Sequence, residues 1–527
     1  MAFLSVHIDL PEVNHQWLHS VADSLKFDPS SPLQLPSPFM LATLLVFFLV
    51  TACLHRKRTA RNLFTALFSL YLYYKLSGAY VLLLLLIALS DYLIARRIGK
   101  NVSAQGSSEN GDAVAESRGC KALVGLSVVM NVSILLFFKA NGVFSDFLCS
   151  ISSGNIALRH IAVPAGISFF CFQSISYVVD TYRGTITPLK SFTDYLFLLS
   201  YFPKMFLGPL VKNADFIAQM NRDEISVSKE DCSTATRMIV FGTVKFCIFS
   251  KIIGSLFVAP AFAGTLGDSG FVALMAAFAF TIQLYCDFSG YTDLACGVSL
   301  LAGYRLPLNF DFPYCSATIT EFWRRWHISL SSWLRDYLYI PLGGSRRGTA
   351  RTYLNLLVTM FLGGLWHGVG VMFVLWGLWH GVLLCLHKLW MKVASGAAPT
   401  GDRLPLWRRV IGTFFTFNAV AFGWMMFRSP DWSTFAVMLG SMFHNFGADT
   451  IPQTLSANAP AFTAMAIAYL CHSIPSKALP RIDRAVLSLR LPGQAILIAL
   501  AIWAAFQCDA IFFASSASSA LPIYANF

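Results

Sequence analysis

The sequence predicts an all-α, polytopic membrane protein, and three observations support that prediction. Of the 527 residues, 56% are hydrophobic and only 13% are charged, whereas soluble domains are about a quarter charged. Apolar segments of about 18 residues or more, the length at which a helix crosses a bilayer, recur along the chain. Basic residues gather in the short loops between these segments, as the positive-inside rule predicts for loops on the cytoplasmic side.

The apolar segments set the number and order of the membrane spans. Several are short or interrupted, so we expect about 11–13 spans in total. The chain does not begin with a basic stretch followed by an apolar core, so we expect the spans themselves, and no cleavable signal peptide, to direct insertion. The clear candidates, in order, are residues 38–54, 80–95, 123–139, 161–179, 195–211, 238–261, 270–285, 352–366, 369–387, 410–426, 459–471 and 492–513.

The charge distribution sets the orientation and excludes one class of partner. The net charge is +12, but basic residues lie in short loops such as 55–61, 96–100 and 477–490, which we assign to the cytoplasm. We therefore expect no nucleic-acid partner. Residues 1–36 lean acidic and are expected outside, as an extracytoplasmic extension, whereas residues 37–527 are expected to form one membrane domain.

Residues 304–351 differ from the other hydrophilic segments, because they are long, aromatic and rich in arginine. Within them, residues 321–340 (EFWRRWHISLSSWLRDYLYI) are expected to form one helix with a charged face and a wide aromatic face. On this helix His327 lies in an apolar stripe, one turn after Trp323. Such a helix suits the membrane interface, so we expect 304–351 to be an interfacial or re-entrant region on the cytoplasmic side.

The arginines of this region are candidate ligands for a phosphate group. Guanidinium groups bind phosphate through paired hydrogen bonds, so the region suits the entry of a coenzyme A thioester or a phosphopantetheine arm. An ordinary positive cluster that contacts lipid headgroups explains the same residues equally well. The predicted donor-binding residues are Arg324, Arg325 and Arg335.

Residues 361–381 (FLGGLWHGVGVMFVLWGLWHG) are almost wholly apolar yet contain two histidines. Ionisable residues within membrane spans are rare and usually functional. A buried imidazole stays neutral, so His367 is a candidate general base near neutral pH. A histidine hydrogen-bonded to a carbonyl of a neighbouring helix is the alternative. The glycines around His367 allow backbone or substrate to approach closely, which favours the catalytic interpretation.

We expect the other two histidines of this region to be structural or interfacial. His380 follows His367 by thirteen residues, which is about 140° around an ideal helix. If the helix is continuous, at most one of the two therefore points at a given site. His387 shares the face of His380 and lies near the end of the span.

Other polar residues in apolar surroundings are expected to be structural or to line a channel. Asp287 and Asp293 are six residues apart in QLYCDFSGYTD, which suggests a cation, but no third ligand is evident, and we predict no metal site. Asp180 and Arg183 are spaced for a local ion pair. In a transporter or flippase, Asp287, Asp293 and His367 become coupling sites, but the interrupted Gly-rich segments concentrate in one half of the chain, unlike the paired halves of transporters.

Several motifs together resemble the membrane-bound O-acyltransferase family, specifically its bacterial alginate O-acetyltransferase-like branch. The D-alanyl transfer protein of teichoic-acid modification is a related branch that shares several of them. The motifs are FWRRWHISLSSWLRDYLYIPLGGSRRG, VPAGISFFCFQSISYVVDTYRG, YFPKMFLGPLVK, YCDFSGYTDLACG, LPLNFDFPY and LGGLWHG.

The resemblance implies a fold and two catalytic residues. The family fold is a ring of tilted transmembrane helices around a thin centre, where a cytoplasmic funnel meets an outer one. The invariant family histidine corresponds to His367, which takes the proton of the acceptor hydroxyl or orients it. The second family histidine, an Asn in many eukaryotic members, corresponds to His327, which orients the acceptor, polarises the thioester carbonyl or helps to stabilise the oxyanion.

The resemblance also implies an activity, a donor and partners. We expect an acyltransferase of the bacterial cytoplasmic (inner) membrane that uses a cytoplasmic thioester, first acetyl-CoA and otherwise a phosphopantetheine thioester on a carrier, with no bound cofactor. The acyl group, acetyl in the first instance, is expected to reach an exopolysaccharide or cell-wall glycan, often through a periplasmic SGNH-type transferase. Transfer of D-alanyl from a carrier protein is the alternative within the family.

Overall fold

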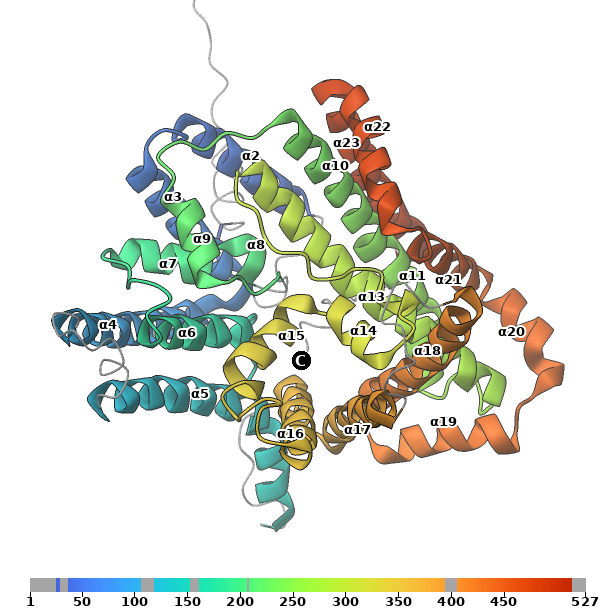
Figure 1. Ribbon diagram of the computed structural model, residues 1–527. Coiled ribbons are helices and arrows are strands. Elements are labelled where there is room, and N and C mark those ends of the chain that lie inside the picture. The colour runs from blue at the N-terminus through green and yellow to red at the C-terminus, as the bar shows by residue number, and fades with distance from the viewer. Residues whose placement is uncertain are drawn as a thin grey trace, which may run out of the picture.

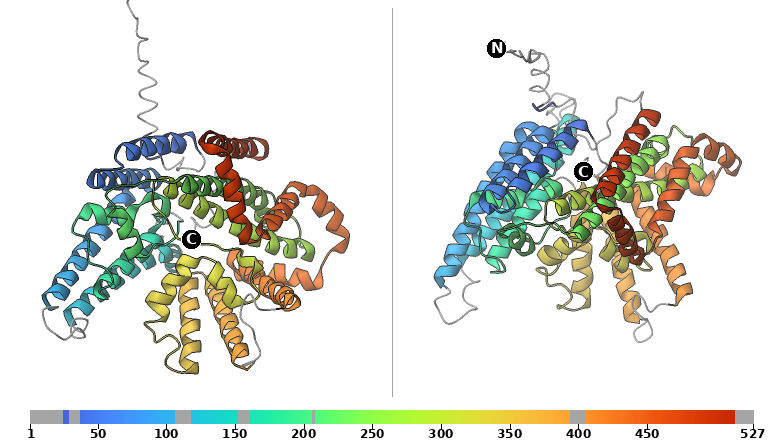
Figure 2. Two further views of the ribbon diagram at one scale, coloured as in Figure 1. Left: turned by 45° about the horizontal axis from the view of Figure 1, so that its top comes forward. Right: turned by 90° about the horizontal axis from the view of Figure 1, so that it is seen from above.

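The structure, a computed structural model, describes residues 25–28, 37–105, 118–151, 161–205, 208–393 and 405–513. Among these residues the secondary structure is helical and includes no strand, which confirms the all-α prediction. Most of the extension predicted for residues 1–36 lies outside the described residues. Figure 1 shows longer helices arranged around the short helices α14 and α15, and Figure 2 shows that the helices are inclined to one another.

The described residues include seven helices that are long and apolar enough to cross a membrane. Two shorter apolar helices, Pro38–Cys53 and Ala459–His472, accompany them. The protein is therefore a multi-pass membrane protein, although the helices of full length are fewer than the spans we expected. The seven are Arg58–Asn101, Arg118–Gly142, Lys229–Phe262, Gly270–Leu301, Val371–Val393, Leu406–Arg428 and Arg490–Phe512.

Two of the predicted spans are interrupted or shortened, which partly explains the difference. Residues 195–211 do not form one helix: α7 (Phe192–Ser200) ends before α8 (Phe202–Met205), because Pro203 cannot continue the helical hydrogen bonding that precedes it. The segment 161–179 becomes α6 (Ile167–Tyr182), a helix of only 16 residues.

The first half of the chain forms a group of neighbouring helices on the left of Figure 1. It begins with α2 (Pro38–Cys53) and α3 (Arg58–Ser77), and a 3-10 turn over Gly78–Tyr80 joins α3 to α4 (Val81–Gln105). The lipid-facing side of α4 carries leucines that remain exposed, such as Leu82 at 67%. The group also contains α5 (Arg118–Ile151), α6, α7 and α9 (Asn213–Met220).

A buried carboxylate holds these helices together. Asp91 on α4 has no exposed surface and accepts hydrogen bonds from Ser127 (2.5 Å) and Asn131 (2.8 Å) on α5. It also accepts one from Ser174 on α6 (2.6 Å), whose hydroxyl lies 2.8 Å from that of Tyr195 on α7. A buried carboxylate with this many donors is a fixed structural element.

We expect Asp91→Ala to lower the stability of the protein by about 3 kcal/mol, because three buried donors lose their acceptor. Asp91→Asn keeps one acceptor oxygen and is expected to cost less. The measurement is the midpoint of thermal unfolding in detergent, with Asp449→Ala as the control, since Asp449 is exposed. Equal midpoints for Asp91→Ala and Asp449→Ala would contradict this role.

The second half begins with two long helices that pack backbone to backbone. A span of 34 residues runs over Lys229–Phe262, and it packs against α13 (Gly270–Leu301). At their contact, a Cβ on Gly242 would lie 2.7 Å from the carbonyl oxygen of Gly290, so only glycine fits there. The pieces of the first span are α10 (Lys229–Thr243), two π-helical turns (Val244–Ser250 and Gly254–Val258), α11 (Lys251–Ile253) and α12 (Ala259–Phe262).

The remaining helices surround the short central ones. The central pieces are α14 (Ile319–Arg325), α15 (Ile328–Leu334) and a π-helical turn (Arg335–Tyr339), with α16 and α17 below them in Figure 1. The prediction that 304–351 lies at the cytoplasmic interface stays a prediction. The later helices are α16 (Thr349–His367), α17 (Val371–Val393), α18 (Leu406–Arg428), α19 (Trp432–His444), α20 (Ile451–Ala457), α21 (Ala459–His472), α22 (Leu479–Ser488) and α23 (Arg490–Phe512).

Candidate functional site

The helix expected over residues 321–340 is broken at His327, so that expectation is wrong. The His327 backbone is left-handed (φ 44°, ψ 54°) and separates α14 from α15. Asn309 stabilises the break: its carbonyl accepts from the amide of Ile328 (2.9 Å), and its side-chain oxygen accepts from the amide and hydroxyl of Ser329 (3.2 and 2.9 Å). Non-glycine residues in this conformation are uncommon and cluster at functional sites.

Asn309 also sets the tautomer of the His327 ring. The ring is 1% exposed, and its Nδ1 lies 3.2 Å from Oδ1 of Asn309. Because that oxygen already accepts from Ser329, it is the amide oxygen and cannot donate. Nδ1 therefore carries the proton, and the lone pair of the neutral ring is on Nε2. The edge of Phe288 contacts the ring, with centroids 4.6 Å apart, which fixes its plane.

His367 is the last helical residue of α16 and is also buried, at 4% exposure. Its ring lies edge-to-face with Trp376 (5.1 Å between centroids) and Phe427 (5.0 Å). The backbone leaves the helix at Gly368. Hence the imidazole is held at a helix terminus between aromatic rings of α17 and α18, and not in the middle of a span.

The structure brings the two predicted histidines together. The Trp366 ring contacts both, with centroid distances of 4.5 Å to His367 and 6.2 Å to His327. Two residues 40 positions apart in sequence therefore meet at one place, where the ends of α16, α14 and α15 converge.

His380 lies on a different helix from His367, as the separate spans 352–366 and 369–387 predict, so the angle calculated for a continuous helix does not apply. The chain turns between Gly368 and Val371, and α17 runs back along α16. Both imidazoles contact the Trp376 ring, each with a centroid distance of 5.1 Å. His380 is fully buried, and neither ring nitrogen has a hydrogen-bond partner among the described residues.

His387 lies seven residues after His380 on α17. Its Nδ1 is 2.9 Å from the Thr320 hydroxyl of α14. That contact agrees with a structural role for His387, which stays a prediction.

The three arginines predicted to bind the donor do not form one cluster. Arg325 pairs with Glu321 at 2.7 Å, and Arg335 pairs with the neighbouring Asp336 at 2.7 Å. Arg324 and Arg335 are exposed, so both can meet a phosphate group in solution. Arg325 is half-buried and engaged by Glu321, which makes it the weakest of the three candidates.

The aspartates considered for a cation site have separate protein partners. Asp293 accepts from Lys245 at 2.5 Å, and Asp287 accepts from Ser250 at 3.2 Å. In the part of the chain that the structure describes, no group of three or more His, Cys, Asp or Glu side chains could hold a metal ion.

The local ion pair expected for Asp180 and Arg183 is also not what forms. Asp180 instead accepts from the Tyr337 hydroxyl (2.7 Å) and the Asn213 amide (2.8 Å). Arg183 donates to the carbonyl of Asp336 and lies over the Tyr337 ring. Asp180 thus ties α6 to the π-helical turn that follows α15.

Sequence reasoning missed two residues that contact the site. Asn309 lies in the LPLNFDFPY motif, but nothing local shows that it reaches a residue 18 positions later. Lys139 ends the predicted span 123–139. In the structure its ammonium group donates to the carbonyl of Trp366, so it belongs to the surroundings of the site.

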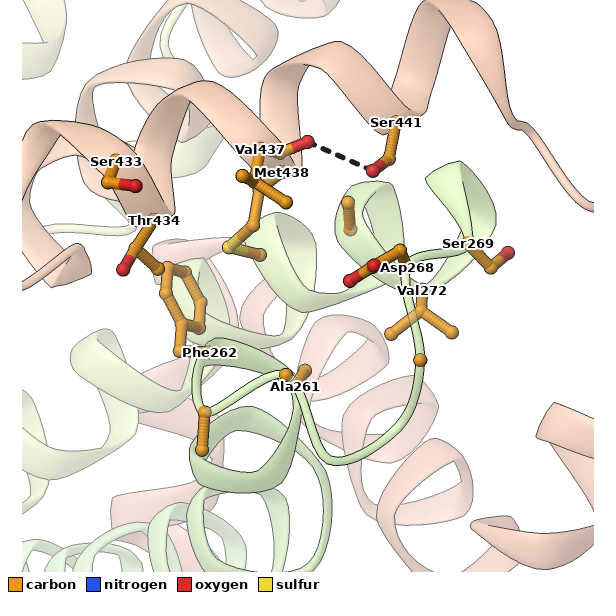
Figure 3. A pocket seen from close by; sticks show the side chains of 14 residues that line it. Ala261, Phe262, Asp268, Ser269, Val272, Ser433, Thr434, Val437, Met438 and Ser441 are labelled. Atoms are coloured by element: carbon orange, nitrogen blue, oxygen red, sulfur yellow. Dashed lines mark hydrogen bonds between the residues drawn. The ribbon is translucent and has the colours of Figure 1, made fainter.

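A separate pocket of about 210 Å³ lies between the turn after α12 and α19. Figure 3 shows Ser433, Thr434 and Ser441 along α19 on one side of it, and Asp268 and Ser269 in the turn on the other. None of the predicted site residues lines this pocket. The two candidate catalytic histidines are buried and lie outside this hollow.

Comparison with known proteins identifies the family. Residues 178–427 match the model described as "MBOAT, membrane-bound O-acyltransferase family", and this stretch includes His327, His367 and Asn309. Lys139 lies outside it.

Related proteins agree with this match. The "Probable alginate O-acetylase" of Pseudomonas putida is 39% identical over 331 residues, which are 61% of this chain and 64% of the relative. The "Peptidoglycan O-acetyltransferase" of Helicobacter pylori is 32% identical over 336 residues, 58% of this chain and 62% of the relative. The "Teichoic acid D-alanyltransferase" of Streptococcus thermophilus is 28% identical over 287 residues, 50% of this chain and 67% of the relative. The chain spans less than two thirds of the length of the first two relatives. Residues 178–427 therefore form a membrane-bound O-acyltransferase domain, and the resemblance seen in the motifs is confirmed.

Proposed function

We propose that the protein is an O-acyltransferase that moves an acyl group, acetyl in the first instance, from a cytoplasmic thioester to a glycan. The observation that carries this proposal is the pair of buried imidazoles that both contact the Trp366 ring. Acyl transfer to a hydroxyl needs a base for the hydroxyl proton and a group that orients the attacking oxygen. Two neighbouring imidazoles in an apolar interior supply both.

The roles of the two histidines follow from their surroundings. His367 takes the proton of the acceptor hydroxyl as its oxygen attacks the thioester carbonyl carbon. The carbon–sulfur bond then breaks, and the leaving thiolate takes the proton from the imidazole, so no proton is gained or lost overall. His327 has its lone pair on Nε2, which makes it a hydrogen-bond acceptor for the attacking hydroxyl. That tautomer favours an orienting role over donation to the oxyanion.

The names of the relatives support the proposed donor and acceptor. Two of the compared relatives are named for O-acetyl transfer and are more similar to the chain than the one named for D-alanyl transfer. We therefore propose acetyl-CoA as donor, with a carrier-bound D-alanyl thioester second. The acceptor is an exopolysaccharide or cell-wall glycan, reached through a periplasmic SGNH-type transferase, and the membrane is the bacterial inner membrane.

The direct test uses purified protein in nanodiscs with radiolabelled acetyl-CoA. We expect thiol release that depends on a polyhydroxylated acceptor, and in cells the label is expected to appear on surface polymer. A labelled D-alanyl carrier that supports release, where acetyl-CoA does not, would select the second donor. Substrate movement across sealed vesicles without thioester cleavage would refute the enzyme and favour a transporter.

The donor site is tested by Arg324→Gln and Arg335→Gln. Each is expected to raise the KM for acetyl-CoA about tenfold with little change in kcat, because a charge-assisted contact to phosphate is lost. The control is Arg408→Gln, which removes an exposed arginine next to Trp407. An unchanged KM in both site variants would leave these arginines as lipid-headgroup contacts only.

A further inference from the structure

Lys139 of α5 reaches the terminus of α16 at the candidate catalytic histidine. Its Nζ donates to the carbonyl oxygen of Trp366 and lies 3.4 Å from that of His367. The same ammonium group lies 5.2 Å from the centroid of the Trp366 ring. One side chain therefore contacts both backbone and ring of Trp366, the residue whose ring contacts both histidines.

This contact provides a hydrogen-bond donor for carbonyl groups at the end of α16. The last carbonyl groups of an α-helix have no partner within the helix, and a cation near them is favourable because the helix dipole places partial negative charge there. His367 is the final residue of α16 and is followed by Gly368, which restrains the backbone weakly. Without an external partner, the end of α16 is free to fray.

Because the Trp366 ring contacts both histidines, a restraint on Trp366 also limits the movement of their rings. It packs against Phe172 of α6, with centroids 5.6 Å apart and planes 21° from parallel. The ammonium group of Lys139 adds a cation–π contact. Since Trp366 contacts His367 and His327 directly, its position sets the distance between the two imidazoles.

A lysine is costly in an apolar span unless it makes such contacts. Lys139 lies within the membrane-crossing helix Arg118–Gly142 and is partly buried. The cost of desolvating its ammonium group is offset only by good partners. Here those partners are two backbone carbonyls and an indole ring, all belonging to the candidate site.

We propose that Lys139 is a positioning residue for acyl transfer. It holds the end of α16 so that His367 and Trp366 keep the positions relative to His327 that the reaction needs. This inference rests on the proposed function. Lys139 acts through the backbone and does not touch substrate, so its loss lowers turnover and leaves donor binding unchanged.

The test compares Lys139→Met, which keeps the length of the side chain but removes its charge and donors, with Lys139→Arg, which keeps both. Lys139→Met is expected to lower kcat about 10–100-fold, with the KM for acetyl-CoA within about twofold of wild type, because small displacements of catalytic groups cost this much. Lys139→Arg is expected to recover most of the loss. Lys251→Met is the matched control, since Lys251 pairs with Asp509 at 2.9 Å on other helices.

A second readout does not depend on activity. Hydrogen exchange of the peptide covering residues 362–372, measured in nanodiscs, is expected to speed up in Lys139→Met and not in Lys251→Met. If Lys139→Met does not insert, Lys139→Gln, which retains a neutral donor, takes its place.

Two outcomes would overturn the proposal: wild-type turnover in Lys139→Met, or unchanged exchange at residues 362–372 in that variant. A wild-type protein that cleaves no thioester, with faster exchange in Lys139→Met, would remove the proposed function but keep the restraint on α16. Failure of the inference and failure of the function are therefore distinguishable.

Discussion

His367→Ala is expected to abolish detectable acyl transfer while the protein still inserts and folds. General-base assistance alone contributes about 10²–10⁴-fold, and an apolar interior offers no water to replace the imidazole. The measurement is acetyl-CoA-dependent thiol release by purified protein. Because His367 lies at a helix end between rings of Trp376 and Phe427, its removal is expected to leave the helices in place.

The control for this variant is His387→Ala, which removes a histidine from the neighbouring helix without touching the pair. Its contact is the Thr320 hydroxyl, and we expect transfer near the wild-type rate. The elution profile and unfolding midpoint in detergent establish that each variant is folded. Normal transfer by His367→Ala would rule out the proposed mechanism.

The second large effect is expected at His327 and its partner. His327→Asn removes the imidazole at a position whose backbone Asn tolerates, and kcat is expected to fall by about 10²-fold or more. Asn309→Leu keeps a similar volume but removes the acceptor for Nδ1 of His327 and for Ser329. We expect a loss of comparable size, because the ring is then free to change tautomer and orientation.

The double variant tests whether the two residues act as a unit. If Asn309 acts through His327, the combination of His327→Asn and Asn309→Leu is expected to lose little more activity than either single change. Measured kcat values for the four proteins of this cycle decide the point. Fully multiplicative losses would show that Asn309 affects turnover by another route, such as general destabilisation of α15.

The long helices and the pair of histidines could be predicted from sequence, for different reasons. Hydropathy alone locates helices such as Gly270–Leu301, because their apolar length exceeds the thickness of a bilayer. The histidines were found because they lie in recognisable motifs. Neither argument could show that His327 and His367 approach the same tryptophan, since that contact joins segments 40 residues apart.

The breaks in the helices were harder to predict because distant or weak signals determine them. The break at His327 depends on Asn309, which lies outside the segment 321–340. The sequence of that segment alone therefore does not predict the break. The turn after His367 had a local signal in Gly368 and Gly370, and the predicted spans 352–366 and 369–387 are separated there. Lys139 meets its partners 227 positions later in the chain, so no local pattern could have identified them.

The left-handed backbone at residue 327 limits which amino acids evolution or an engineer can place there. Asparagine and glycine adopt that conformation at small cost, whereas β-branched and bulky residues are genuine outliers in it. His327 can therefore be replaced without backbone strain by only a few residue types. If codon 327 is randomised, folded protein is expected mainly from variants with residues that tolerate this backbone, whether or not those variants are active.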